Sequence, residues 1–321
     1  MTPALPAGHL TTIPVDDLEL GGANAPVNEF ERLTAPLPLG AARLQTHLVG
    51  DLPLDALVVN RATDELVVSF HGALNREATA LPRFERLRMI LGHDVSCLFF
   101  GDPTLHLSPR IQLSWYTGTA DVDAHAELAS RAQQVAQSVG ASRIIFTGSS
   151  GGGFAALQVS SLVPGSVAVA FNAQTDIAAY RVNGVSWGVQ REYVQTVWPA
   201  VWARLDPATV VENGHWVDQI DDRISAVRRY ASARGNRVYL VQNEEEFHHE
   251  DHFLPFLEAA RAAGNEIIAS TNREGTLHNP PRAETFNAKL TEVLLRERGV
   301  ESRASRATSE VEVGEPLADS Q

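Results

Sequence analysis

The stretch from Ile144 to Ser160 is the sequence feature that most constrains the fold. It reads Ile-Ile-Phe-Thr-Gly-Ser-Ser-Gly-Gly-Gly-Phe-Ala-Ala-Leu-Gln-Val-Ser. The β-branched and aromatic start is typical of a buried strand, and the pattern from Phe154 onward is helical. The turn between them contains Gly148-Ser149-Ser150-Gly151-Gly152, which matches G-x-S-x-G with Ser150 at the centre. The stretch therefore predicts a serine exposed at a strand-to-helix turn.

A serine in such a turn needs strained backbone angles, and its neighbours must lack side chains that would collide with it. The helix that follows directs its first amide N–H groups toward the atom on which negative charge develops. Ser150 is therefore the candidate nucleophile, and Ser149 is the adjacent alternative. A phosphate-binding loop is the competing interpretation, but no Gly-Lys-Ser/Thr follows and the run Gly151–Gly153 does not give G-x-G-x-x-G.

The composition sets limits on partners and location. The 321 residues are 44% hydrophobic and 20% charged, which suits one large globular domain. A net charge of −13 without a Lys/Arg cluster argues against nucleic acid or an anionic membrane as a partner. The single cysteine, Cys97, excludes an internal disulfide and lies in an apolar run typical of a core. No apolar run approaches a membrane span and no secretory signal is recognisable at the N-terminus, so we expect a cytoplasmic protein.

The chain divides into an arm, a domain and a tail. Residues 1–35 have no sustained period and predict an irregular arm, whereas residues 36–300 predict one α/β domain. Alternating strands and helices indicate a mostly parallel sheet with helices on both faces. Residues 172–232 interrupt this alternation and hold four of the five tryptophans, as either a cap over an apolar substrate or extra helices at the sheet edge. The polar, acidic residues 301–321 predict disorder.

The hydrophobic pattern also predicts the individual elements. Strands are expected at 41–49, 54–60, 66–70, 95–100, 144–146, 167–171, 237–242 and 266–270. Helices are expected at 83–91 and at 283–298, and from a cap at residue 121 or 123 to residue 139. Two more are expected from residue 154 onward and from the end of the segment 243–252 to about residue 263.

The loop after the strand at 66–70 offers donors for a developing oxyanion. It reads His71-Gly72-Ala73-Leu74-Asn75-Arg76. A loop beside the serine turn can present a backbone N–H to the substrate, and Gly72 allows close approach. The expected donors are the amides of Ala73 or Gly72 and of Gly151. We expect His71 to brace this loop rather than to act as a base. Asp102 and the aromatic loop 114–118 are candidates for lining the pocket.

A candidate base and a set of candidate acids follow the last two expected strands. His278 lies in the loop 271–281, and residues 243–252 read Asn-Glu-Glu-Glu-Phe-His-His-Glu-Asp-His. An imidazole can take the proton of a serine hydroxyl, and a carboxylate on the other ring nitrogen fixes the tautomer.

In these features the chain resembles the α/β-hydrolases, over about residues 40–298. The resemblance rests on the G-x-S-x-G turn, the His-Gly loop, and an acid and then a histidine after the last two strands. The family order of Ser, Asp/Glu and His implies Ser150, an acid within 243–251 and His278.

The family motif Gly-x-x-Asp implies Glu246 as the acid, with Glu in place of the usual Asp. The longer side chain leaves Glu245 as an alternative. Asp176, after the preceding strand, is a further alternative because some members take their acid there.

Three histidines in the acidic segment also allow a metal site. His248 and His252 have the i, i+4 spacing of zincin-type H-E-x-x-H, but His249 occupies the position of the glutamate. We therefore expect no metal or cofactor. One of the histidines is expected to support the acid loop or to line the pocket.

The sequence thus predicts a serine hydrolase that cleaves a small-molecule or glycan ester through an acyl-enzyme on Ser150. The alternatives are an O-acyltransferase or deacetylase acting on a glycan, and a non-catalytic binding or assembly module on a hydrolase scaffold. A shorter likeness, through Ser-Ser-Gly-Gly-Gly-Phe-Ala-Ala and a Gln-Asn-(x)n-His-His segment, is to bacterial hydrolase-like proteins of surface-polysaccharide and glycoprotein-export loci.

Overall fold

The computed structural model describes residues 10–30, 33, 36–182, 185–186, 188–205 and 215–299. The chain divides into two units, Met1–Arg282 and Ala283–Gln321. The second unit contains helix α8 (Ala283–Glu297), close to its predicted bounds. The predicted tail 301–321 and the first nine residues of the predicted arm lie outside the described residues.

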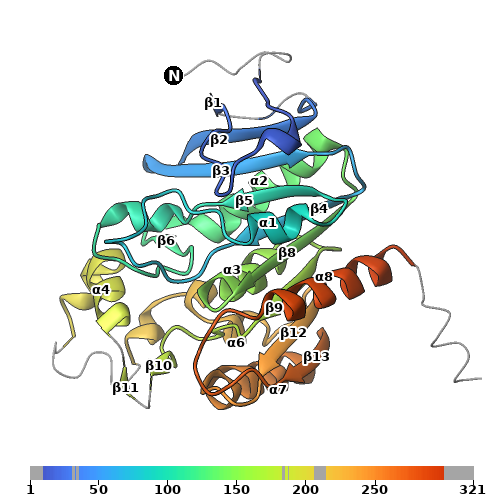
Figure 1. Ribbon diagram of the computed structural model, residues 1–321. Coiled ribbons are helices and arrows are strands. Elements are labelled where there is room, and N and C mark those ends of the chain that lie inside the picture. Colours follow the sequence, from blue (N-terminus) through green and yellow to red (C-terminus); the bar gives the residue numbers. More distant parts are fainter. Residues whose placement is uncertain are drawn as a thin grey trace, which may run out of the picture. The chain divides into compact units, whose positions relative to one another are not determined.

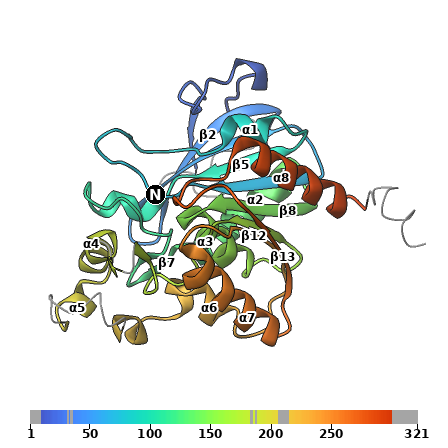
Figure 2. The ribbon, with the colours of Figure 1, turned by 60° about the horizontal axis from the view of Figure 1, so that its bottom comes forward.

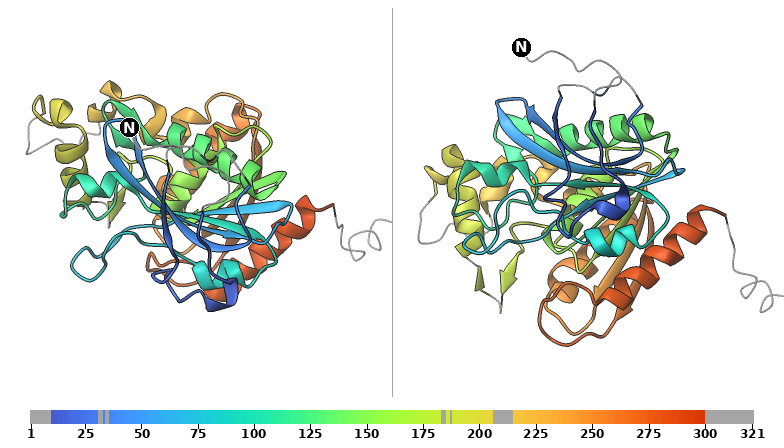
Figure 3. Two further views of the ribbon diagram at one scale, coloured as in Figure 1. Left: turned by 90° about the horizontal axis from the view of Figure 1, so that it is seen from above. Right: turned by 45° about the horizontal axis from the view of Figure 1, so that its top comes forward.

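One mixed sheet of nine strands is the framework of the described part of the first unit (Figure 1). Its spatial order is β1-β2-β3-β5-β4-β8-β9-β12-β13. The strands are β1 (Val27–Glu29), β2 (Gly40–Leu48), β3 (Leu52–Asn60), β4 (Glu65–Phe70), β5 (Ser96–Phe100), β8 (Arg143–Ser149), β9 (Val167–Phe171), β12 (Arg237–Asn243) and β13 (Glu266–Asn272). The sheet twists from one edge to the other (Figure 3).

Six neighbouring strands of this sheet run parallel to one another, in the spatial order β5-β4-β8-β9-β12-β13. Strand β3 is antiparallel to both of its neighbours, β2 and β5. Val67 of β4 pairs with Cys97 of β5 and with Ile145 of β8, which fixes the register at the centre of the sheet. Because parallel strands end at the same edge, the loops after β4, β8, β9, β12 and β13 meet there.

The central strands are apolar because both of their faces are covered. Every residue of β4, β5 and β9 is buried. Helices α2 (Ala124–Val139) and α3 (Gly151–Ser160) pack on one face, against residues that include Val58, Val68 and Phe146. The alternate residues of these strands point to the opposite face, where the short helix α1 (Leu87–Leu91) lies (Figures 1 and 2).

Helix α2 follows its predicted signals closely. The Asp123 side chain accepts a hydrogen bond from the amide of Ala126 at the start, and Gly140 ends the helix with φ of 78°. Helix α1 is shorter than predicted, because its N-cap Arg86 has φ of 64° and the preceding residues make other contacts. The carbonyl of Glu85 accepts from Ser69 Oγ, and its carboxylate accepts from the amide of Gly72.

The arm predicted as irregular contains regular structure that the sequence analysis missed. Strand β1 adds to the sheet beside β2, and a 3₁₀ turn covers Val15–Asp17. The strand spans only three residues, and its burial pattern of exposed, buried, exposed gives too few positions for a period to show.

The interruption between β9 and β12 is built of short elements. These are β10 (Arg181–Val182), β11 (Val185–Ser186), α4 (Gly188–Val197), α5 (Pro199–Trp202), α6 (Ala226–Arg229) and 3₁₀ turns at His215–Gln219 and Asp222–Ile224. Tyr193, Trp198 and Trp216 are buried in one core cluster with Trp115. Trp198 Nε1 donates to the hydroxyl of Tyr193 at 2.9 Å. These rings therefore pack the interruption onto the sheet domain; Trp187 lies outside the described residues.

Further short elements lie in the connections between the strands of the large sheet. Helix α7 (Leu254–Ala262) follows a π-helical turn at His249–Phe253, and a 3₁₀ turn spans Pro103–Leu107. A two-stranded ribbon pairs β6 (Gly118–Thr119) with β7 (Val122–Asp123). None of the described helices is long and apolar enough to span a membrane.

Strand β8 and helix α3 touch backbone to backbone through two glycines. A Cβ on Gly148 would lie 2.4 Å from the carbonyl carbon and oxygen of Gly152. A Cβ on Gly152 would lie 2.4 Å from the carbonyl oxygen of Phe70 in β4. Main-chain atoms cannot turn away as a flexible side chain can, so any residue other than glycine at these positions forces the backbones apart.

We expect Gly152→Ala to lower the free energy of unfolding by about 3 kcal/mol, because its methyl group overlaps main-chain atoms. Gly188→Ala is the matched control: nothing lies within 4 Å of its Cβ position, so the change should be within about 1 kcal/mol. Urea unfolding of both variants measures the difference. Equal stabilities would show that the backbones can separate at no cost.

Candidate active site

Ser150 lies at the junction of β8 and α3 with strained backbone angles. Its φ of 56° and ψ of −122° fall in a region that non-glycine residues rarely adopt. Two hydrogen bonds hold this conformation: the amide of Ser150 donates to the carbonyl of Phe171, and its carbonyl accepts from Phe154 in the first turn of α3. The strand, turn and helix therefore have the predicted arrangement, with the side chain of Ser150 partly exposed.

The predicted base and acid meet Ser150 in one chain of hydrogen bonds. His278 Nε2 lies 2.9 Å from Ser150 Oγ, and His278 Nδ1 lies 2.5 Å from Glu246 Oε2. Glu246 follows β12 and His278 follows β13, so neighbouring parallel strands deliver them to the same edge. The buried Glu246 also accepts a hydrogen bond from Gln242 through Oε1 at 2.8 Å.

The two alternative acids point elsewhere. Glu245 is exposed, and its Oε2 accepts from the amide of Gly275 at 2.7 Å. Asp176 accepts from Ser225 Oγ at 2.7 Å and from the amide of Ala178, and burial raises the pKa of its carboxyl. Of the three predicted acids, Glu246 is therefore the one that contacts His278.

Glu245 and Asn243 nevertheless fix the distance between the acid and the base. Asn243 Nδ2 donates to the carbonyl of Gly275, and its Oδ1 accepts from the amides of Glu245 and Glu274. These bonds join the turn that carries Glu246 to the loop that carries His278.

The loop after β4 lies against the serine turn, as predicted. A Cβ on Gly72 would lie 3.3 Å from the carbonyl oxygen of Ser149. The Gly72 amide, however, donates to Glu85 Oε2 at 3.0 Å, so the expectation that it serves as an oxyanion donor is wrong. The Ala73 and Gly151 amides are the predicted donors that are left. Gly151 is the first residue of α3, and the first amides of a helix have no intrahelical partner.

His71 determines which way the Ala73 amide points. His71 Nε2 accepts from the amide of Asp102 at 3.2 Å, so Nδ1 carries the hydrogen and donates to the carbonyl of Gly72 at 2.8 Å. In a planar trans peptide the next N–H points opposite to that carbonyl, so this bond orients the Ala73 amide. Burial lowers the pKa of His71 and keeps the ring neutral. The predicted bracing role of His71 agrees with this geometry.

Asp102 and the aromatic loop 114–118 are buried and hydrogen-bonded to each other, so they support the site rather than line a pocket. Asp102 Oδ2 accepts from Ser114 Oγ at 2.7 Å and from the amide of Tyr116 at 3.1 Å, and burial raises the pKa of its carboxyl. Trp115 and Tyr116 are fully buried. Cys97 is also buried, which raises the pKa of its thiol to about 12 and leaves it without nucleophilic character.

No protein-family model matches the chain, and no curated protein matches its sequence. Solved structures do match it in three dimensions. Carboxyl esterase 2 from the fungus Tuber melanosporum is 16% identical with a TM-score of 0.51, covering 85% of this chain and 89% of the esterase. The chain has the α/β-hydrolase fold.

Two further solved structures match over more than four fifths of this chain. The capsule O-acetyltransferase of Neisseria meningitidis serogroup A is 14% identical with a TM-score of 0.53, covering 82% of this chain and 97% of the transferase. A Streptococcus agalactiae Glycosylation Associate Protein (Gap123) complex matches with 14% identity and a TM-score of 0.55 over 83% of this chain. This chain spans about half (48%) of that complex's matched chain and 35% of the matched dipeptidyl peptidase 4 of Porphyromonas gingivalis. The molecule is thus a hydrolase-fold protein that resembles esterases and peptidases.

Two buried histidines, His248 and His252, lie beside His278. The ring centroids of His248 and His278 are 4.0 Å apart, and those of His248 and His252 are 4.7 Å apart. Burial, together with the charge that His278 can carry, lowers the pKa of His248 well below its ordinary range and that of His252 to about 3. Both rings are therefore neutral. His249 is partly exposed and faces Glu250.

The neutral rings hold the loop after β9. His248 Nδ1 lies 3.0 Å from the carbonyl of Asn172 and donates to it, and His252 Nδ1 accepts from the amide of Thr175 at 3.2 Å. Two of the three histidines thus serve as supports. The sequence-based expectation is one histidine that supports the acid loop or lines the pocket, whereas the loop that these two rings hold is the one after β9.

A metal does not suit the donor atoms of this region. Among the described residues, Glu246, His248 and His278 have ligand atoms within 4.8 Å of one another. Glu246 and His278 are hydrogen-bonded to each other and His278 Nε2 faces Ser150, which leaves His248 Nε2 as the one ring nitrogen of the three residues without a hydrogen-bond partner. His252 accepts through Nδ1, so its Nε2 carries a hydrogen and offers no lone pair to an ion. The site is better described by hydrogen bonding.

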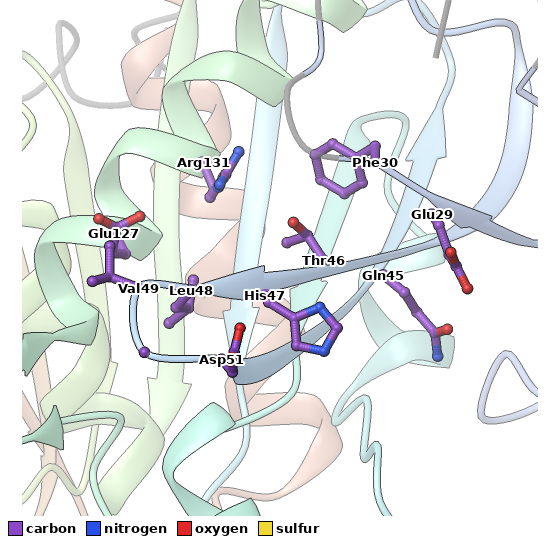
Figure 4. Close-up of a pocket in the computed structure, with 11 residues that line it drawn as sticks. Glu29, Phe30, Gln45, Thr46, His47, Leu48, Val49, Asp51, Glu127 and Arg131 are labelled. Atoms are coloured by element: carbon purple, nitrogen blue, oxygen red, sulfur yellow. The ribbon is translucent and has the colours of Figure 1, made fainter. Parts of the chain in front are cut away.

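A separate surface cavity lies at the β2–β3 hairpin. It has a volume of about 610 Å³, and its lining includes Phe30, His47, Glu127 and Arg131 (Figure 4). Residues of the Ser150 site do not contribute to it.

The neutral state of His252 predicts a pH dependence of stability. The unfolded chain binds this proton near pH 6.5, whereas the folded protein with a pKa of about 3 does not. The free energy of unfolding is therefore unaffected above pH 6.5 and falls below it, by up to about 1.4 kcal/mol per pH unit for this side chain. We expect His252→Gln to reduce that slope between pH 6.5 and 5 in urea unfolding. An unchanged slope in His252→Gln would contradict a neutral buried ring.

Proposed function

We propose that the protein is a serine hydrolase that cleaves a carboxylic ester through an acyl-enzyme on Ser150. The observation that carries the proposal is the continuous chain of hydrogen bonds from Ser150 Oγ through His278 to the buried Glu246. A fold shared with esterases supports it.

In the first half of the reaction, Ser150 Oγ attacks the ester carbonyl carbon while its proton passes to His278 Nε2. Glu246 holds the Nδ1–H of His278 and stabilises the imidazolium that forms. The carbonyl oxygen becomes an oxyanion, for which the amides of Ala73 and Gly151 are the proposed donors. The tetrahedral intermediate then collapses, and the imidazolium gives its proton to the departing alkoxide.

In the second half, water attacks the acyl-enzyme and His278 again takes the proton. The carboxylic acid leaves, and Ser150 regains its hydrogen from His278. The strained backbone of Ser150 suits both halves because it holds Oγ clear of its own helix and beside the base.

Acyl transfer is the second candidate, and the structural likeness to a capsule O-acetyltransferase favours it. The same residues perform it when a hydroxyl group replaces water in the second half. The substrate would then be a glycan, as donor or as acceptor. A glycan deacetylase uses the same first half with water as acceptor. Product analysis with a sugar acceptor present distinguishes transfer, which gives a new ester, from hydrolysis, which gives free acid.

A fluorophosphonate probe tests for an activated serine. We expect the wild-type protein to be labelled, and Ser150→Ala and His278→Ala to abolish labelling, because one removes the nucleophile and the other its base. Ser149→Ala is the matched control and should be labelled like the wild type, since Ser149 is the buried last residue of β8. A folded wild-type protein that resists the probe would favour a non-catalytic binding module instead.

A second comparison tests which carboxylate serves the base. We expect Glu246→Gln to lower kcat for a p-nitrophenyl ester by about 10³–10⁴-fold, because the amide favours the wrong His278 tautomer. Glu245→Gln keeps an oxygen for the Gly275 amide and should stay within a few-fold of wild type. Comparable losses in the two variants would mean that the acid turn acts through its shape rather than through Glu246.

A further inference from the structure

A glutamine that the sequence analysis did not single out contacts the proposed nucleophile. Gln174 lies three residues beyond β9 and is fully buried. Its Nε2 donates to Ser150 Oγ at 3.2 Å, and its Oε1 accepts from Trp115 Nε1 at 2.5 Å. We propose that Gln174, locked by Trp115, is a positioning residue that directs the Ser150 hydroxyl hydrogen to His278. This inference rests on the proposed function of the same site.

Trp115 fixes which end of the Gln174 amide faces Ser150. An indole N–H can only donate, so the amide atom beside it must be the oxygen. The NH₂ group then lies on the side of Ser150. The orientation follows from the hydrogen-bonding chemistry of the neighbours, which is the way amide orientations are assigned.

Gln174 and Glu246 together set the direction of the bonds between them. Ser150 Oγ accepts from Gln174, so its single hydrogen is free to point to His278 Nε2. Glu246 Oε2 can only accept, so His278 Nδ1 carries the hydrogen of the neutral ring and Nε2 is the unprotonated nitrogen. The chain starts at a group that can only donate and ends at a carboxylate that can only accept. Only one direction of donation satisfies every hydrogen bond in this chain, which runs through Trp115, Gln174, Ser150, His278 and Glu246.

This direction is the one that the reaction needs. A serine hydroxyl rotates freely and can place its hydrogen in several directions, of which one faces the base. Holding the hydrogen on the line between Oγ and Nε2 before substrate arrives removes that rotational freedom from the activation barrier. Gln174 stays in place when the proton moves to Nε2 and Oγ bonds to the acyl carbon.

The backbone around Gln174 is held on both sides. On one side, the carbonyl of Asn172 accepts a hydrogen bond from the neutral ring of His248. On the other side, the amide of Thr175 donates to the neutral ring of His252, and Thr175 Oγ1 donates to the carbonyl of His252 at 2.9 Å. The Gln174 side chain also hydrogen-bonds Tyr180, whose pKa burial raises to about 12. The supporting histidines thus act on the loop whose side chain reaches Ser150.

Two replacements of similar length separate positioning from packing. Gln174→Met leaves the Ser150 hydroxyl free to face His278 but unguided, and we expect kcat to fall by about 10-fold. Gln174→Glu keeps the shape and an acceptor for Trp115. When ionised, however, the new carboxylate draws the hydroxyl hydrogen away from His278, and we expect a fall of about 10²–10³-fold. A packing role predicts the reverse order, because the glutamate is the closer mimic.

The pH profile adds a signature that packing would not produce. A protonated carboxyl at position 174 can donate to Ser150 Oγ, and burial raises the pKa of such a group. The ratio of Gln174→Glu to Gln174→Met activity should therefore fall as the pH rises. Gln158→Glu is the matched control: Gln158 is equally buried but donates to the carbonyls of Asp222 and Arg223. It should lower the melting temperature while leaving kcat per folded molecule within a few-fold of wild type.

A measurement without substrate keeps this inference distinct from the proposed function. In ¹⁵N NMR of histidine-labelled protein, with His278→Asn used for assignment, we expect wild-type His278 to carry its proton on Nδ1 and to accept a hydrogen bond at Nε2. Gln174→Glu at alkaline pH should shift the Nε2 resonance toward an unbonded nitrogen, whereas Gln174→Met should retain the hydrogen bond. An unchanged Nε2 resonance in Gln174→Glu would overturn the inference, whether or not the protein proves to hydrolyse esters.

Discussion

The close approach of three backbones at Gly148 and Gly152 is the constraint on which the site depends. Strand β4, strand β8 and helix α3 come within van der Waals contact there, and a Cβ at either glycine would lie 2.4 Å from main-chain atoms. This contact lets the chain turn from strand to helix within one residue, and Ser150 takes the strained angles that the turn requires. The packing of apolar strands around the turn supplies the stability that offsets this strain.

Parallel strands convert this local turn into a site. The loops after β4, β9, β12 and β13 end at the edge where Ser150 lies, so His278 reaches it from 128 positions away in the sequence. The edge alone sets only approximate positions. Short cross-links set the distances, chiefly those from Asn243 to the His278 loop and from His71 to the carbonyl of Gly72. Asn243 and His71, which lie outside the Ser150–His278–Glu246 chain, thus determine where the groups of the proposed reaction lie.

The sequence predicts the parts of this structure that repeat or that lie near one another in the chain. The alternation of strands and helices, the cap of α2 at Asp123 and the junction at Ser150 follow from local patterns, and the fold expected from the family resemblance is present. The parts that it missed depend on contacts between distant segments. The start of α1 and the occupied Gly72 amide both result from Glu85 turning back toward the β4 loop. No local pattern could have revealed the bond between Trp115 and Gln174, which joins residues 59 positions apart.

The electrostatic design of the edge explains why so many of its polar groups are uncharged. In the proposed reaction, proton transfer from Ser150 turns His278 into a cation, and a second cation nearby would oppose that step. Burial and the charge of His278 itself keep His248 and His252 neutral, so two rings pack behind the base without repelling it. Gln174 contacts Ser150 as a neutral donor, and the buried carboxylate of Glu246 then contacts the imidazolium directly. The arrangement favours the charge-separated state of the proposed ester cleavage, because the opposite charge is in contact with His278 and the neighbouring rings carry none.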